Sequence, residues 1–131
     1  MSKKIVIIKI GATGDVVRTT VLLHLYANDE ITWITAKHNI AILPFQRKNL
    51  KRVIAIDEVE NSGILNEQFD FVISLDDDFK CASLASKFNT IELFGAYNQN
   101  DKVVYTSNAN EWFDMGLSSR LGKQKADEIK W

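Results

Sequence analysis

The sequence of 131 residues is poor in several residue types, and each shortage excludes a class of protein. Its one cysteine, Cys81, excludes an internal disulfide framework and any multi-cysteine metal site, which favours a reducing cytoplasmic compartment. The apolar run from Ile5 to Ile8 stops at Lys9, so it is too short for a signal-peptide core or a membrane span. The net charge of -1 provides no uniform field for nucleic acid or an acidic membrane, and such a partner would need a local patch.

The remaining composition, 46% hydrophobic and 25% charged, is that of one ordinary globular domain. Short apolar runs start roughly twenty residues apart, which leaves room for a crossover helix between consecutive strands. We therefore predict an α/β fold with a Rossmann-like parallel sheet, strand order 3-2-1-4-5, and a C-terminal hairpin. The predicted strands are 5–10, 31–35, 53–56, 69–75 and 90–94, a turn follows over 95–102, and 103–106 is the return strand of the hairpin.

The first predicted helix follows the loop after strand one and spans residues 15–26. Asp15 stands where an N-cap residue would stand. The apolar residues fall on one helical stripe, which we expect to face the sheet: Val17, Val21, Leu22 and Leu25.

A second helix is predicted over residues 79–88, where apolar residues recur at helical spacing. Asp77 or Asp78 is expected to cap it. Cys81 lies on the apolar stripe, which favours a place in the core over a reactive thiol.

Three other segments carry weaker helix signals. Pro44 and Gly63 interrupt the candidates at 36–49 and 59–68. The last stretch, 111–131, is predicted to be helical in part. It ends without a capping glycine or a proline, so we expect the chain to be cut from a longer protein.

The predicted sheet also locates a ligand site. In a doubly wound sheet, ligands bind outside the carboxyl ends of the strands, where the strand order reverses. Loops 11–15 and 76–79 should meet there. The first loop lacks a dinucleotide fingerprint, because Thr13 and Val16 occupy its second and third glycine positions, and it is not a P-loop. Asp15 argues against bound phosphate, because a carboxylate at a helix start fills the place of an anion.

Asp15 is a candidate general base. The helix dipole favours its ionised form, which can accept the proton of a sugar hydroxyl as that hydroxyl attacks an electrophilic carbon. The alternative is that Asp15 serves only as an N-cap.

Residues 4–20, Lys-Ile-Val-Ile-Ile-Lys-Ile-Gly-Ala-Thr-Gly-Asp-Val-Val-Arg-Thr-Thr, closely resemble the opening of glycosyltransferase family nine. This family comprises the ADP-heptose:lipopolysaccharide heptosyltransferases and their relatives. The resemblance continues through 30–35, 69–76 and 112–117, so it covers nearly the whole chain but only the N-terminal half of the family. A Gly-Asp pair at the helix start followed by Thr-Thr is the most specific part.

This resemblance implies half of an inverting GT-B enzyme with two Rossmann-like domains. Residues 1–131 would bind a glycan or lipid-linked sugar acceptor, such as the lipopolysaccharide core. The absent C-terminal domain would bind the nucleotide-sugar donor, ADP-heptose, so we expect this chain alone to be inactive or nearly so. The resemblance implies no cofactor and no metal, no nucleic-acid partner, and a cytoplasmic location at the inner face of the inner membrane with at most peripheral association.

The resemblance also assigns site residues. Asp15 matches the base of the family. The residues expected to contact substrate are Gly11, Thr13, Gly14, Arg18, Thr19 and Asp76.

Two rival interpretations remain. One is a small binding or receiver-like module in which Asp15, Asp57 and aspartates 76–78 hold magnesium. A receiver would place acidic residues directly after strand one, where this chain has Gly11. The other is a fragment kept as an interaction scaffold without turnover.

Several charged or polar residues have two readings. Lys9 is unusual in a buried strand and is expected to reach the crevice or extend past the strand end. His24 and His38 lack ligand spacing, so a metal role is not expected. Five cations without intervening carboxylates would meet an anionic acceptor or form a solvated face: Lys37, Arg47, Lys48, Lys51 and Arg52.

Overall fold

The computed structural model describes residues 2–11 and 13–107, without the side chains of Thr13 and Asp15. The predicted helical stretch 111–131 and the resemblance at 112–117 therefore lie outside the described residues. Within the described part, one sheet has the order β3-β2-β1-β4-β5-β6. Its strands are β1 (Lys4–Ile8), β2 (Glu30–Thr35), β3 (Leu50–Ala55), β4 (Gln68–Ser74), β5 (Asn89–Gln99) and β6 (Lys102–Tyr105).

The strand pairing confirms the predicted fold. β1 pairs in parallel with β2 and β4, and β3 and β5 continue the sheet in parallel on either side. β6 runs antiparallel to β5, as the predicted hairpin requires. The order reverses beside β1, between β1 and β4, so the topological switch point lies there.

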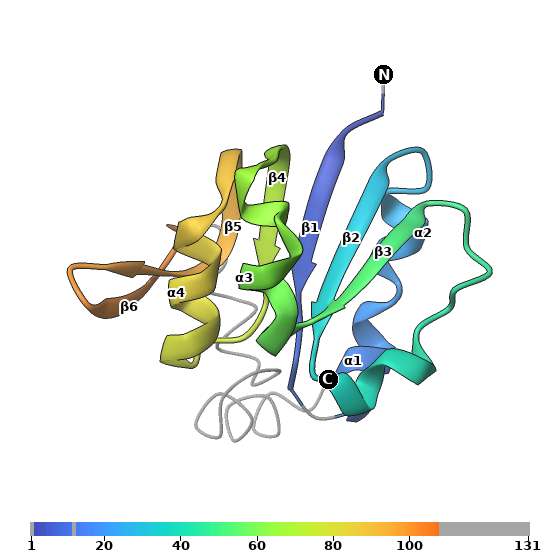
Figure 1. Cartoon of the computed structure of the whole chain (residues 1–131), viewed down its shortest axis with the longest axis horizontal. Coiled ribbons are helices and arrows are strands. Elements are labelled where there is room, and N and C mark those ends of the chain that lie inside the picture. The colour runs from blue at the N-terminus through green and yellow to red at the C-terminus, as the bar shows by residue number, and fades with distance from the viewer. Residues whose placement is uncertain (1, 12, 108–131) are drawn as a thin grey trace.

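Helices cover both faces of the sheet, with α3 (Val59–Ser62) and α4 (Phe79–Lys87) in front in Figure 1 and α1 (Thr13–Thr19) and α2 (Leu22–Leu25) behind. Because side chains alternate along a strand, β1 supplies both cores. Val6 and Ile8 pack in the core that includes residues of α3 and α4, whereas Ile5 and Ile7 pack in the one that includes residues of α1 and α2. All four side chains are fully buried, which confirms β1 as the central strand.

The predicted first helix is wrong in its boundaries and in its buried side. It begins at Thr13 and divides into α1 and α2 near Thr20, where the N–H group of Thr20 donates to the carbonyl oxygen of Val17. Apolar residues lie on both sides of this segment, so periodicity alone did not decide which side faces the sheet. Val16 and Leu23 are buried, whereas much of the expected stripe is exposed: Val17 51%, Val21 56% and Leu25 70%.

The helix α4 confirms the second prediction. Its N-cap is Asp78, whose carboxylate accepts a hydrogen bond from the N–H of Cys81 at 3.3 Å. Cys81 is buried in the core, and burial raises the pKa of its thiol, so the group stays protonated.

The two weaker helix candidates form short pieces. Residues 36–49 contain the 3₁₀ helix η1 (Lys37–Ile42). Residues 56–68 contain the 3₁₀ helices η2 (Ile56–Glu58) and η3 (Ile64–Asn66) on either side of α3. Gly63, with φ 83°, ends α3 in the left-handed conformation that glycine adopts without strain.

The turn predicted over residues 95–102 is wrong in extent. β5 continues to Gln99, and the reversal takes only Asn100 and Asp101, which have φ values of 55° and 63°. At Gly95, β5 passes from pairing with β4 to pairing with β6. A Cβ on Gly95 would lie 1.8 Å from the backbone oxygen of Ser74, so this crossing requires glycine.

Candidate functional site

A buried ion pair lies at the carboxyl ends of β1 and β4, where the site is predicted. Lys9 directly follows β1 and Asp76 lies just beyond β4, and the distance from Lys9 Nζ to Asp76 Oδ1 is 2.5 Å. The lysine side chain is 0% exposed and the aspartate side chain 6% exposed. A buried charge requires such a partner, so the two loops are joined across the switch point.

The same carboxylate also holds the backbone of the strand-one loop. Asp76 Oδ2 accepts hydrogen bonds from the N–H groups of Ile10, at 2.5 Å, and Gly11, at 3.2 Å. On the other side, the side-chain amide of Asn39 in η1 donates to the carbonyl oxygen of Gly11 at 3.3 Å. The loop that leads into α1 is therefore held by one residue after β4 and by another after β2. This confirms that loops 11–15 and 76–79 meet.

Gly11 lies where neighbouring side chains leave too little room for a Cβ atom. A Cβ there would lie 2.8 Å from Lys9 Nζ and 3.0 Å from Asp76 Oδ1. These distances are shorter than ordinary van der Waals contact. Any other residue would have to displace the ion pair, so the packing explains the glycine without invoking a ligand.

The remaining aspartates of this edge have structural partners. Asp77 accepts a hydrogen bond from the Tyr105 hydroxyl at 3.1 Å, and Asp78 caps α4. Asp57 forms an exposed ion pair with Lys80. Among the described side chains of residues 2–107, which do not include that of Asp15, no three from His, Cys, Asp or Glu are grouped so as to hold a metal ion. The arrangement accounts for aspartates 76–78 through packing and capping.

The predicted substrate-contacting residues are placed differently from one another. Gly14 is exposed in α1, and a Cβ there would meet no atom within 4 Å. Arg18 is exposed one turn later. Thr19 is buried, and its hydroxyl donates to the carbonyl oxygen of Val16 at 2.8 Å. Gly14 and Arg18 therefore offer open surface, while Thr19 faces the core and Asp76 faces Lys9. The substrate contacts of these residues stay predictions.

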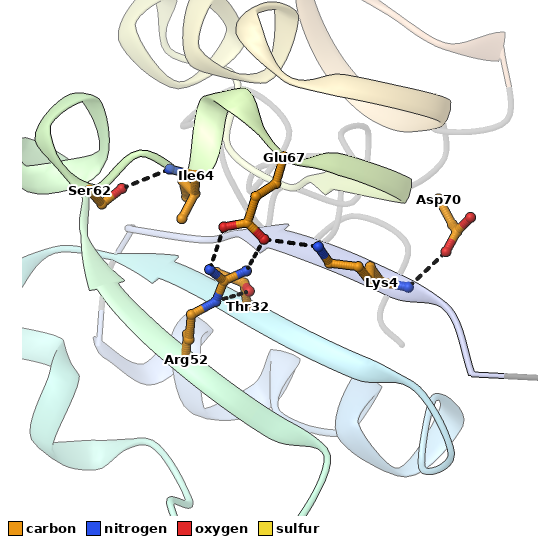
Figure 2. A network of polar contacts seen from close by, with 7 residues as sticks. All are labelled: Lys4, Thr32, Arg52, Ser62, Ile64, Glu67 and Asp70. Atoms are coloured by element: carbon orange, nitrogen blue, oxygen red, sulfur yellow. Dashed lines mark hydrogen bonds and ion pairs between the residues drawn. The ribbon is translucent and has the colours of Figure 1, made fainter.

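A second polar network lies at the opposite, amino-terminal end of β1 (Figure 2). Glu67 receives two hydrogen bonds from the Arg52 guanidinium, at 2.7 and 3.1 Å, and one from Lys4 Nζ at 2.9 Å. Arg52 also donates to the hydroxyl of Thr32. These hydrogen bonds lower the pKa of Glu67 to about 2. The network ties β1, β2 and β3 to the segment before β4, so Arg52 serves the fold there.

A hollow of about 420 Å³ opens between α3 and α4. Its apolar lining includes Ile56, Phe79 and Leu84. The charged residues around it are paired with each other, Lys80 with Asp57 and Lys87 with Glu60. Apolar side chains therefore line this hollow, and ion pairs neutralise the charged residues around it.

Two of the remaining predictions can be placed. Lys9 extends past the end of β1, as one of its two readings expected, but it ends on Asp76. The ring of His24 receives a hydrogen bond from Arg47, with Nη2 and Nδ1 2.8 Å apart. From the sequence, Lys9 is unusual in a buried strand and Asp76 is a predicted substrate contact, with nothing to connect the two. Only the adjacency of β1 and β4 could have linked them.

The fold and the strand order define the chain as a Rossmann-like α/β domain with its switch point beside β1. No family model and no curated protein matches the sequence. The structure is similar to that of a glycosyl transferase family 9 protein from Veillonella parvula, with a TM-score of 0.60 and 21% sequence identity. The similarity covers 72% of this chain and 32% of that protein, so this chain spans about a third of its length. At this identity the similarity shows a shared fold.

No helix in the described part of the chain is both long enough and apolar enough to cross a membrane.

Proposed function

We propose that this chain is the acceptor-binding part of an inverting glycosyltransferase. The observation that carries the proposal is the fold shared with a glycosyl transferase family 9 protein. The Gly-Asp motif in the first turn of α1 supports it, because α1 begins just after β1 at the switch point, where sheets of this kind bind their ligands. The neighbour is about three times longer than the matched part, which supports a donor-binding domain outside this chain.

In the proposed reaction, Asp15 is the general base. It takes the proton of an acceptor hydroxyl as the hydroxyl oxygen attacks the anomeric carbon of the nucleotide sugar. The bond from that carbon to the diphosphate breaks, the nucleoside diphosphate leaves, and the configuration inverts. We propose heptose from ADP-heptose as the sugar and a lipopolysaccharide core as the acceptor, met at the inner face of the inner membrane.

The role of the described residues is to hold the loop still. Asp76 and Asn39 bind Gly11 from two sides. A base has to lie within hydrogen-bond reach of the proton that it accepts, so a rigid loop serves the reaction. No metal or cofactor enters the proposal.

The activity is tested by supplying the chain with a donor-binding domain, in trans or in a longer reading frame. ADP-heptose and a lipopolysaccharide-core acceptor are added, and mass spectrometry follows the gain of heptose and the release of ADP. We expect Asp15→Asn to lower kcat by about a hundredfold or more with an unchanged circular dichroism spectrum. Asp57→Asn, at an exposed aspartate elsewhere, is the matched control and should keep its activity. Near-normal turnover by Asp15→Asn would contradict the assignment of the base.

Acceptor binding can be tested separately on this chain by NMR. Because the space above Gly14 is open, Gly14→Leu should fold normally and weaken the binding of a core oligosaccharide. The control, Lys87→Leu on α4, should leave that binding unchanged. Equal binding by both variants would show that the acceptor does not bind beside Gly14. In a parallel titration, tight and saturable magnesium shifts at aspartates 76–78 would favour the receiver-like module instead.

A further inference from the structure

The outer edge of the sheet is open along the first half of β5, residues 89–94, here called the β5 edge. On its inner side this part of β5 pairs with β4, whereas β6 pairs only with residues 96–99. In the part of the chain that the structure describes, no strand lies beyond the β5 edge, because the hairpin projects away from the sheet (Figure 1). Such an edge presents backbone N–H and C=O groups with which a further strand can pair.

The residues of the β5 edge favour pairing. Natural proteins usually protect an open edge with lysine, proline or a bulge. Residues 90–94 have the sequence Thr-Ile-Glu-Leu-Phe, without lysine or proline and with several residue types that are enriched in strands. Ile91 is 71% exposed, more than any other large apolar residue of the described part of the chain. The edge therefore combines a sequence of high strand propensity with an uncovered aliphatic side chain.

The hairpin does not continue along this edge. In the register of β5 with β6, the residues after Thr106 would lie beside Phe94 and then Leu93. Instead β6 ends at Tyr105, and neither Thr106 nor Ser107 continues it as a strand. The next three residues in the sequence, Asn-Ala-Asn, are of types depleted in strands. These observations favour a strand from another molecule as the partner of the β5 edge.

We propose that two copies of this chain dimerise by antiparallel pairing of their β5 edges about a two-fold axis at Ile91. A two-fold axis joins the same surface of both copies, as is usual in homodimers. Ile91 is the middle residue of 89–93, and it would lie opposite its counterpart and cover it. An axis at Glu92 would place two carboxylates opposite each other, whereas the axis at Ile91 places Glu92 opposite the uncharged Thr90.

The occupant is a second copy because this register makes the β5 edge complementary to itself. The net charge of -1 gives little repulsion between two copies. The dimer would have one continuous sheet, with β5 of each copy at its centre. The switch point beside β1 lies on the far side of β4 from the β5 edge, so the proposal does not rest on the glycosyltransferase activity.

The test is sedimentation of the full chain over a range of concentrations, with hydrogen exchange on the same samples. We expect twice the mass of one chain at high concentration, and slower exchange of the amides of residues 89–94 as the dimer forms. Ile91→Lys and Ile91→Glu should each weaken dimerisation at least about tenfold, because each places like charges opposite each other and removes a buried aliphatic pair. An equimolar mixture of the two variants should restore the dimer, because opposite charges then face each other across the axis.

The matched control is Leu25→Lys, which changes an equally exposed leucine in α2, 70% exposed, and should dimerise like the unmodified chain. A chain that stays monomeric at all concentrations would overturn the proposal. A dimer that Ile91→Lys leaves intact, or that Leu25→Lys dissociates, would overturn it in favour of another surface. A mixture of Ile91→Lys with Ile91→Glu that stays monomeric would overturn the axis at Ile91. Slow exchange of residues 89–94 in a monomer would overturn the proposal in favour of residues 108–131 as the cover of this edge.

Discussion

The buried pair of Lys9 and Asp76 makes the sharpest prediction for the stability of this domain. Asp76→Asn keeps the size of the side chain but removes its charge. It takes the charge of Asp76 away from the ammonium group of Lys9, whose side chain is 0% exposed. Removing one member of a buried ion pair typically costs about 3–5 kcal/mol. We expect a loss of that size in the free energy of unfolding.

The opposite substitution should be milder. Lys9→Met removes the ammonium group, but Asp76 keeps the N–H groups of Ile10 and Gly11 as donors. Charge-assisted hydrogen bonds of this kind contribute about 1.5–3 kcal/mol each, so the remaining carboxylate is partly compensated. In Lys9→Met/Asp76→Asn both charges of this pair are removed together. We therefore expect the double variant to be more stable than the sum of the single losses implies, by about 1–3 kcal/mol.

The assay is urea unfolding followed by far-ultraviolet circular dichroism, with a stabilising osmolyte in all samples if Asp76→Asn is unfolded in buffer. The matched control is Asp57→Asn, which breaks an ion pair whose side chains are 63% and 79% exposed. Exposed pairs contribute little, so the control should change stability by less than about 1 kcal/mol. A comparable small change in Asp76→Asn, or strictly additive losses, would refute the reasoning that the pair is buried and coupled.

Three further substitutions test the packing. Gly95→Ala should prevent normal folding, seen as loss of the cooperative transition, because its Cβ would overlap the backbone of β4, while Gly14→Ala should be neutral or stabilise by about 0.5–1 kcal/mol. Thr35→Val should raise the unfolding midpoint by removing a buried hydroxyl that has no partner among the described atoms; a drop of more than about 1 kcal/mol would show that the hydroxyl is bonded. Glu67 has a pKa lowered from 4.5 to about 2, so its contribution is complete above pH 4.5 and is lost as the pH falls toward 2. Glu67→Gln should therefore cost about 1 kcal/mol at pH 7 and less at pH 2, and an equal cost at both would contradict the ion pairing.

The sequence by itself determined the class of fold. Apolar runs at crossover spacing predicted parallel strands, and the topology of doubly wound sheets supplied their order. The sequence also predicted that Asp77 or Asp78 caps α4, since an N-cap acts on the backbone only three residues away, and the structure selects Asp78. The loops that meet at the carboxyl edge followed from the strand order. These features depend on local spacing or on general rules of chain topology.

The tertiary structure decided the rest, because contacts between distant segments have no local signature. Lys9 and Asp76 are 67 residues apart, and only the pairing of β1 with β4 makes them an ion pair. Which side of α1 and α2 is buried was settled by how the helices pack on the sheet, and that left Val21 and Leu25 exposed. Gly95 became a crossing point because the backbone of Ser74 lies against it. In each case the deciding energy is that of packing or desolvation, which depends on neighbours that the chain brings together only when it folds.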